Sequence, residues 1–219
     1  MSCTRKYLIF IFLIILSFIF DKQIVSFVAN QRVESLNPFI SFFKELWVAY
    51  ILFALLSLYF LLKKEDKWLP AMWLSITSAT LISETLKIII ARPRPYEVLP
   101  ITPLGTHCSY SFPSGHITLI FSIVALLGVS ALAKHKEVKL IRYVWLGYAL
   151  AVGLNRIYIG VHYLSDIIAG CFLGYTVGFF WVWMQNNRTL DSIFFKKWWW
   201  LIGLLFFLAR ISLIKIVYS

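Results

Sequence analysis

Charged residues are scarce in this chain, and their scarcity excludes an ordinary soluble domain. Only 14% of the 219 residues are Asp, Glu, Lys or Arg, whereas about 25% is usual in soluble domains. The hydrophobic fraction is 60% and the mean hydropathy is +0.80. With so few charges, most of the surface must face lipid, so the sequence predicts a multi-pass membrane protein.

Cysteine is also rare, which excludes a scaffold built on disulfides. The three cysteines are Cys3 at the N-terminus, Cys108 in a polar loop and Cys171 inside an apolar run. Their spacing matches no metal-binding motif, and no two of them need lie on the same side of a membrane. We interpret them as unpaired thiols.

A cleavage site is missing after the first apolar run. Tyr7 to Phe20 follows Arg5-Lys6 and resembles a secretory signal, but Asp21-Lys22 comes directly after it and no small-residue motif is clear. We interpret the run as an uncleaved first span. It reaches an ordinary length only if it continues to Val28.

Apolar runs of membrane-spanning length are what the chain does contain. Besides the first, they cover residues 47–62, 68–91, 116–133, 143–158 and 162–184. A last run, 198–217, either spans the membrane or lies in its interface, because Arg210 and Lys215 interrupt its far half. The predicted fold is therefore an all-α transmembrane bundle of about six spans with a possible C-terminal seventh, formed by a single domain over residues 1–219.

Two segments between the spans do not match a spanning helix. Residues 23–46 mix apolar and charged side chains and are broken by Asn37-Pro38, which predicts an amphipathic segment lying in the interface. Residues 92–115 contain five prolines, a density that excludes a continuous helix.

The net charge of +11 would suggest nucleic acid as a partner of a soluble protein. Here the cations gather in short connections between spans, so we expect no nucleic acid partner. The basic groups lie at residues 5–6, in the expected loops 63–67 and 134–142, and at residues 188–197. All fall on one side, which the positive-inside rule assigns to the cytoplasm together with the N-terminus. The opposite, extracytoplasmic side then carries the proline-rich loop, His116, Arg156 and His162.

One stretch near the predicted sixth span has the spacing of a nucleophilic site. If the segment from His162 is helical, Asp166 lies one turn later on the same face. Such an aspartate can hold one imidazole nitrogen and leave the other free to attack. Arg156 would end the preceding helix, within reach of an anion at His162.

Two further clusters reach the same membrane face. Lys87 and Arg94 lie where the third span ends, and Ser114-Gly115-His116 opens the fourth. A helix N-terminus presents unpaired N–H groups and the positive end of the helix dipole, which favour a bound phosphate. A glycine there lets the backbone approach phosphate oxygens closely.

In these three clusters the chain resembles the type 2 phosphatidic acid phosphatase (PAP2) superfamily, which is related to the vanadium haloperoxidases. The family signatures are Lys-x6-Arg-Pro, Pro-Ser-Gly-His and Ser-Arg-x5-His-x3-Asp. This chain has Lys87 to Pro95, Pro113 to His116, and Asn155 to Asp166 in the same order, a core of residues 87–166. Asn155 replaces the usual serine.

The resemblance implies a mechanism. His162 would attack phosphorus and form a phosphohistidine, Asp166 would orient it, and His116 would protonate the leaving oxygen and later activate water. The phosphate-binding groups would be Lys87, Arg94, Ser114, Gly115 and Arg156. No metal or other cofactor is expected, because cations and helix ends would neutralise the phosphate. Of the ten acidic residues, only Glu84, Glu97 and Asp166 are expected near the site.

Several residues have weaker assignments. Glu84 lies one turn before Lys87 and would steady it. Arg92 would contact a lipid head group or act as a secondary phosphate ligand, and Asn155 would assist positioning. His107 and His135 are interpreted as interfacial anchors. The row Gly170, Gly174 and Gly178 is expected to pack inside the bundle rather than at a dimer face.

The leading functional prediction is a membrane lipid phosphatase, with membrane lipids as its surroundings and a lipid phosphate as its substrate. The same signatures would serve a lipid phosphotransferase, in which a lipid hydroxyl replaces water. A non-catalytic lipid carrier or scaffold is the third hypothesis. The signatures do not distinguish phosphatidic acid, phosphatidylglycerol phosphate, a polyprenyl diphosphate or a lipid A phosphate, and they leave the oligomeric state open.

Overall fold

The computed structural model describes residues 3–42 and 47–187, and this part of the chain contains helices and no strand. The long helices are α1 (Cys3–Asn30), α3 (Trp47–Leu62), α4 (Leu69–Ile90), α6 (Gly115–Val129), α7 (Lys136–Tyr158) and α8 (Leu164–Asn186). Short helical segments are η1 (Glu34–Leu36), α2 (Asn37–Phe42), η2 (Asp66–Trp68), α5 (Pro95–Val98) and η3 (Ala131–Lys134). The prediction of an all-α bundle is confirmed.

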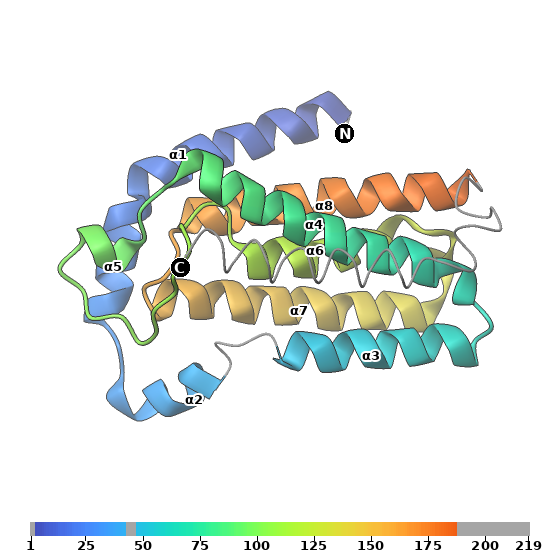
Figure 1. Ribbon diagram of the computed structural model, residues 1–219, viewed down its shortest axis with the longest axis horizontal. Coiled ribbons are helices and arrows are strands. Elements are labelled where there is room, and N and C mark those ends of the chain that lie inside the picture. The colour runs from blue at the N-terminus through green and yellow to red at the C-terminus, as the bar shows by residue number, and fades with distance from the viewer. Residues whose placement is uncertain (1–2, 43–46, 188–219) are drawn as a thin grey trace.

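Helix α6 forms the centre of the bundle. It packs against α4, α7 and α8, and α1 lies obliquely across α8 and α7 (Figure 1). The α6 side chains Ile117, Ile120 and Ile123 are fully buried. On the outer side, α3 joins α7 through the rings of Phe53 and Trp145, whose centroids lie 5.1 Å apart. The central helix is therefore mostly apolar and mostly buried, as expected where other helices surround it.

The outer surface of the bundle is apolar as well. Large hydrophobic side chains are exposed on several helices, including Ile15, Leu58, Leu154 and Phe179. Residues 12–30, 66–98 and 164–186 are long and apolar enough to cross a membrane, and residues 48–62 and 115–129 form shorter apolar helices. Exposed apolar surface of this extent is stable in lipid and not in water.

Helices α6 and α8 approach closely because α8 carries a row of glycines. A Cβ atom on Gly174 would lie 2.1 Å from the carbonyl oxygen of Thr118, and one on Gly178 would lie 2.2 Å from that of Ser122. Gly170 meets the carbonyl of Ser114 in the same way, at 2.9 Å. The prediction that this row packs within the bundle is confirmed.

The structure corrects three predicted boundaries near the ends of the helices. Helix α1 continues to Asn30, so residues 23–30 belong to it and not to an interfacial segment. Asn37-Pro38 begins α2 instead of breaking a helix, since proline is well suited to a first turn. Most of the expected loop 134–142 forms the first turns of α7, whose lysines, leucine and isoleucine are compatible with a helix. The apolar run 198–217 lies outside the described residues.

Candidate active site

One end of the bundle gathers the residues that the three signatures predict. It is formed by the last turns of α4 and α7, the first turns of α6 and α8, and the loop that contains α5, at the left of Figure 1. The polar groups buried there include Lys87, Arg94, Ser114, Arg156, His162 and Asp166. So many buried polar groups in an apolar protein are costly unless they are paired or bind a ligand.

His162 and Asp166 form the centre of this cluster. Nδ1 of His162 lies 3.3 Å from Oδ2 of Asp166, and both side chains are buried. The same oxygen accepts the Tyr163 N–H at 2.9 Å and the hydroxyl of Ser111. A carboxylate held in this way can accept the Nδ1 proton of the imidazole and leave Nε2 with its lone pair.

The predicted helical start at His162 is wrong. The chain turns at Gly160, where φ is +82°, and α8 begins at Leu164 with Tyr163 as its N-cap residue. His162 and Asp166 are nevertheless in contact, because Asp166 lies in the first turn of α8 and its side chain points back over the helix end. The histidine therefore lies just before the helix and not within it.

Burial lowers the pKa of His162 well below its ordinary value of 6.5, and the nearby positive charges of Arg94, Lys87 and Arg156 lower it further. Both effects disfavour the imidazolium form. At neutral pH the ring is therefore uncharged, as a nitrogen nucleophile must be.

The N-terminus of α6 lies beside this pair. The Ser114 N–H donates to the backbone oxygen of Asp166 at 3.1 Å, which joins the two helix starts. Oγ of Ser114 and Nε2 of His116 are buried and have no hydrogen-bond partner among the described residues. Buried polar atoms without a protein partner are unusual unless a ligand or water forms a hydrogen bond with them.

Lys87 reaches the same place from α4. Its ammonium donates to Oε1 of Glu84 at 2.9 Å, and both side chains are largely buried. A Cβ atom on Gly115 would lie 3.4 Å from Nζ of Lys87, so the glycine leaves room for the lysine. The predicted contact between Glu84 and Lys87 is present.

Arg156 is fully buried in the last turn of α7, as its spacing from His162 predicts. Its carbonyl oxygen accepts the N–H groups of Val161 and His162 at 3.2 and 3.3 Å. The residue thus fixes the backbone of the turn before α8, and its charge acts on both His162 and His116.

Arg94 is engaged mainly with the protein backbone. Its guanidinium donates to the carbonyl of Ser109 at 2.6 Å, that of Val161 at 2.8 Å and that of Tyr110 at 3.2 Å, and to Oγ of Ser109 at 2.9 Å. Four of the five N–H donors of a guanidinium are thereby used, which leaves at most one for a phosphate oxygen. Burial lowers the pKa of Arg94, but an arginine remains charged at neutral pH.

Two supporting residues have partners that their sequence positions did not indicate. Nδ2 of Asn155 donates to the carbonyl of Ile40 at 2.7 Å and so ties α7 to α2. Arg92 donates to Oδ1 of Asp166 at 2.6 Å and to Oδ2 of Asp21 at 2.7 Å. Arg92 thus pairs with two buried carboxylates, which its expected role as a lipid head-group contact or secondary phosphate ligand did not include.

Asp21 is the residue that sequence reasoning missed. The sequence left open whether the first span continues past it, and in the structure α1 does so and the Asp21 side chain is buried against α8. Its Oδ1 accepts the Ser165 N–H at 2.9 Å. The expectation that only three acidic residues approach the site is thus wrong. A carboxylate within an apolar run was the available signal, since such a group requires a buried partner.

Comparisons with known proteins place the chain in a family. The family model for the PAP2 superfamily matches residues 68–190. The bacitracin transport permease protein BcrC of Bacillus licheniformis is 32% identical over 70% of this chain and 74% of its own. The undecaprenyl-diphosphatase of Sulfolobus acidocaldarius is 26% identical over 80% of this chain and 82% of its own.

A solved structure shares the fold. The crystal structure of a transmembrane PAP2-type phosphatidylglycerolphosphate phosphatase from Bacillus subtilis aligns with a TM-score of 0.63 and 25% identity. The alignment covers 82% of this chain and 94% of the other. Residues 68–190, which the family model matches, contain all three signatures and the helices α4, α5, α6, α7 and α8. The chain therefore belongs to the PAP2 superfamily.

Proposed function

We propose that this protein is a membrane lipid phosphatase that works through a phosphohistidine at His162. One observation carries the proposal: a buried histidine is oriented by Asp166 at the end of a lipid-embedded bundle. The unpartnered Oγ of Ser114 and Nε2 of His116 beside it are suited to the oxygens of a phosphate.

The first chemical step is the attack of Nε2 of His162 on phosphorus. The new N–P bond forms as the bond from phosphorus to the leaving oxygen breaks, and His116 donates a proton to that oxygen. The Nδ1 proton of His162 stays directed at Asp166, which stabilises the positive charge that develops on the ring.

The second step returns the enzyme to its starting state. Water attacks the phosphohistidine, His116 accepts a proton from that water, and the N–P bond breaks to release inorganic phosphate. His162 is again neutral, and the proton on His116 is available for the next leaving oxygen.

Charge on the phosphate oxygens is offset by protein groups. Lys87 and Arg156 supply buried positive charge. Arg94 adds a third positive charge and at most one further N–H donor. The N-terminus of α6 offers the Ser114 hydroxyl and the Gly115 N–H. These groups make a bound metal unnecessary for charge stabilisation. Glu84 keeps Lys87 in place until phosphate competes for its ammonium.

The site faces the extracytoplasmic side in this proposal. The basic segments at residues 63–67 and 134–139 lie at the end of the bundle opposite the site, at the right of Figure 1. Lysine-rich connections are retained in the cytoplasm, so the site opens toward the outer leaflet.

A polyprenyl diphosphate is the substrate to test first, because an undecaprenyl-diphosphatase aligns with most of this chain. Purified full-length protein would be incubated with undecaprenyl diphosphate, phosphatidylglycerol phosphate, phosphatidic acid and a lipid A phosphate, each with EDTA present. We expect phosphate release from at least one lipid, none from His162→Ala, and unchanged release from His135→Gln. No release from any of them would refute the proposal.

The mechanism and the acceptor need separate measurements. Rapid acid-free quenching with a radiolabelled substrate should trap phosphate on the wild-type chain and not on His162→Ala. An active enzyme without a trapped phosphohistidine would refute the covalent step. Adding a lipid alcohol distinguishes hydrolysis from transfer, because transfer moves the label into the added lipid.

A further inference from the structure

Asp21 links the first helix to the start of α8. It lies in α1, outside the region that the family model matches, and its side chain is only 1% exposed. Its carboxylate accepts the backbone N–H of Ser165 at 2.9 Å and also the Ser165 hydroxyl. A carboxylate at a helix N-terminus is favourably placed against the helix dipole.

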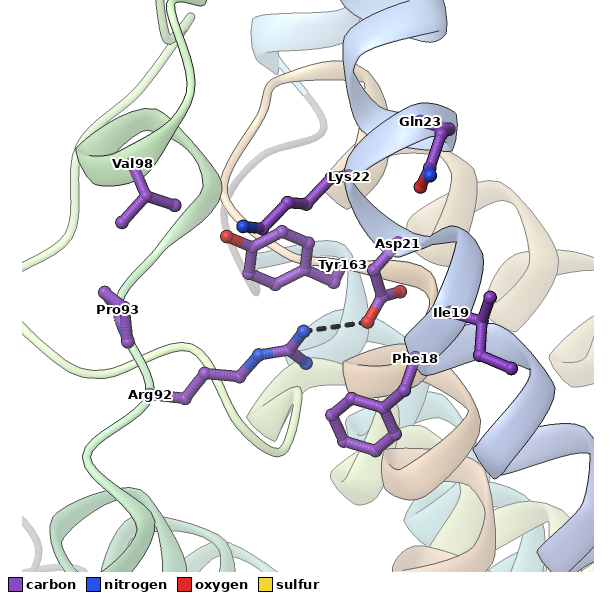
Figure 2. A pocket seen from close by; sticks show the side chains of 9 residues that line it. All are labelled: Phe18, Ile19, Asp21, Lys22, Gln23, Arg92, Pro93, Val98 and Tyr163. Carbon is purple, nitrogen blue, oxygen red and sulfur yellow. Dashed lines mark hydrogen bonds and ion pairs between the residues drawn. The ribbon is translucent and has the colours of Figure 1, made fainter.

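Arg92 joins this carboxylate to that of Asp166. Its Nη2 lies 2.7 Å from Asp21, and its Nη1 lies 2.6 Å from both Asp166 and Oγ of Ser165. Figure 2 shows the guanidinium between the rings of Phe18 and Tyr163, with the ion pair to Asp21 drawn. The guanidinium carbon lies 4.7 Å from the centroid of Phe18 and 4.0 Å from that of Tyr163.

The two oxygens of Asp166 have different partners. Oδ1 is held by Arg92, while Oδ2 receives the Tyr163 N–H and the Ser111 hydroxyl and faces Nδ1 of His162. Since a carboxylate can rotate about its bond to Cβ, fixing one oxygen also fixes the other. Arg92 thereby determines the direction from which Asp166 meets the imidazole.

Asp21 in turn determines the place of Arg92. The rings of Phe18 and Tyr163 flank the guanidinium, and Asp21 and Asp166 each hold one of its two terminal nitrogens. A planar group that binds two carboxylates through two separate nitrogens belongs to arginine and cannot be reproduced by the single ammonium of lysine.

We propose that Asp21 and Arg92 are positioning residues for the His162–Asp166 pair, so that a side chain of the first span orients the nucleophile. The inference rests on the phosphatase function proposed above. Three of the five N–H donors of Arg92 are used by Asp21, Asp166 and Ser165, and the contact with Asp166 is made at Oδ1, whereas His162 faces Oδ2.

Arg92 and Asp21 line an open pocket of about 390 Å³ together with Lys22 and Tyr163 (Figure 2). A pocket of this size admits water, which can hydrate a carboxylate that loses its partner. The isosteric change Asp21→Asn also keeps an oxygen to accept the Ser165 N–H.

The test compares Asp21→Asn, Arg92→Gln and Arg92→Lys with Lys22→Gln in the full-length protein. Lys22 is the neighbour of Asp21 and lines the same pocket, but it is exposed. We expect kcat to fall about 10- to 100-fold in the first three variants, the range found when groups that orient a functional histidine are removed. The KM for the lipid and the inhibition constant of inorganic phosphate should stay within about twofold, since the groups that bind phosphate are untouched.

A double variant tests whether the two residues act as one unit. Adding Asp21→Asn to Arg92→Gln should leave kcat near the value of Arg92→Gln alone, because the aspartate orients Asp166 through the arginine and the asparagine still accepts the Ser165 N–H. If the fold losses in kcat of the two single variants multiply in the double variant, the two residues act independently and the proposal is overturned. Lys22→Gln should behave as the wild type.

The remaining outcomes separate this inference from the proposed function. A lowered melting temperature with unchanged kcat would make the pair a structural tie and overturn the positioning role. A raised inhibition constant for phosphate in Arg92→Gln would make Arg92 a phosphate ligand instead. No phosphate release by the wild type would refute both proposals, whereas an active wild type with equally active variants would refute this one alone.

Discussion

The carbonyl oxygen of Thr118 occupies the space that a side chain at Gly174 would need. A Cβ atom there would lie 2.1 Å from this oxygen, and real contacts of that length do not occur. Thr118 follows His116 by two residues, and Gly174 lies about two turns after Asp166. The contact therefore sets the separation of α6 and α8, and with it the placement of His116 relative to the His162–Asp166 pair.

Gly174→Ala is expected to destabilise the protein by about 1–3 kcal/mol, because an added methyl group forces the helices apart. Thermal unfolding in detergent would show a lower melting temperature, and phosphate release should fall with it. Gly147→Ala is the control, since nothing lies within 4 Å of a Cβ atom at that position of α7. Equal melting temperatures for the two variants would contradict the packing described.

Asp166→Asn is expected to lower kcat by on the order of 10³- to 10⁴-fold, as loss of the orienting aspartate does in serine proteases. The amide cannot accept every hydrogen bond that the carboxylate receives, so the imidazole loses its tautomer and direction. Phosphate release at saturating lipid would measure the effect. Glu97→Gln is the matched control. Glu97 accepts the backbone N–H of Arg94 at 2.8 Å, and the amide oxygen of a glutamine can accept the same N–H. Similar losses in both variants would argue against a special role for Asp166.

The acidic limb of the pH profile is expected below pH 6.5. Burial, with Arg94, Lys87 and Arg156, lowers the pKa of His162 below that value. The neutral ring is the attacking form, so activity persists as the pH falls and is lost only when the pH drops below the lowered pKa. Measurement of kcat/KM across the acidic range tests this, with His135→Gln as the control. A limb at or above 6.5 would show that His162 is not held neutral.

Arg94→Lys is expected to destabilise the proline-rich loop. The ammonium cannot reach the carbonyls of Ser109, Tyr110 and Val161 together, so buried acceptors lose their donors. We expect a loss of about 1–3 kcal/mol, seen as a lower melting temperature. Arg142→Lys is the control, since Nε of Arg142 has no hydrogen-bond partner among the described residues. A larger effect in the control would contradict the role assigned to Arg94.

Composition and spacing alone were enough to predict much of this protein. Long apolar runs have few stable alternatives to transmembrane helices, because each backbone polar group must be satisfied within its own segment. The resemblance to the PAP2 superfamily was readable because three short signatures occur in order. The contact of Glu84 with Lys87 follows from a separation of three residues along α4. The contact of His162 with Asp166 was predicted from a separation of four residues, although Asp166 makes it from the first turn of α8 to a residue that precedes the helix.

Only the tertiary structure decided which distant residues meet. Asp21 and Arg92 are 71 positions apart, and Arg92 and Asp166 are 74 apart. No periodicity relates such positions. Their meeting depends on how α1 crosses α8 and on where the loop after α4 turns back, both of which result from the packing of whole helices. The sequence marked Asp21 as a costly charge in an apolar run, and the fold supplied the partner that makes the charge tolerable.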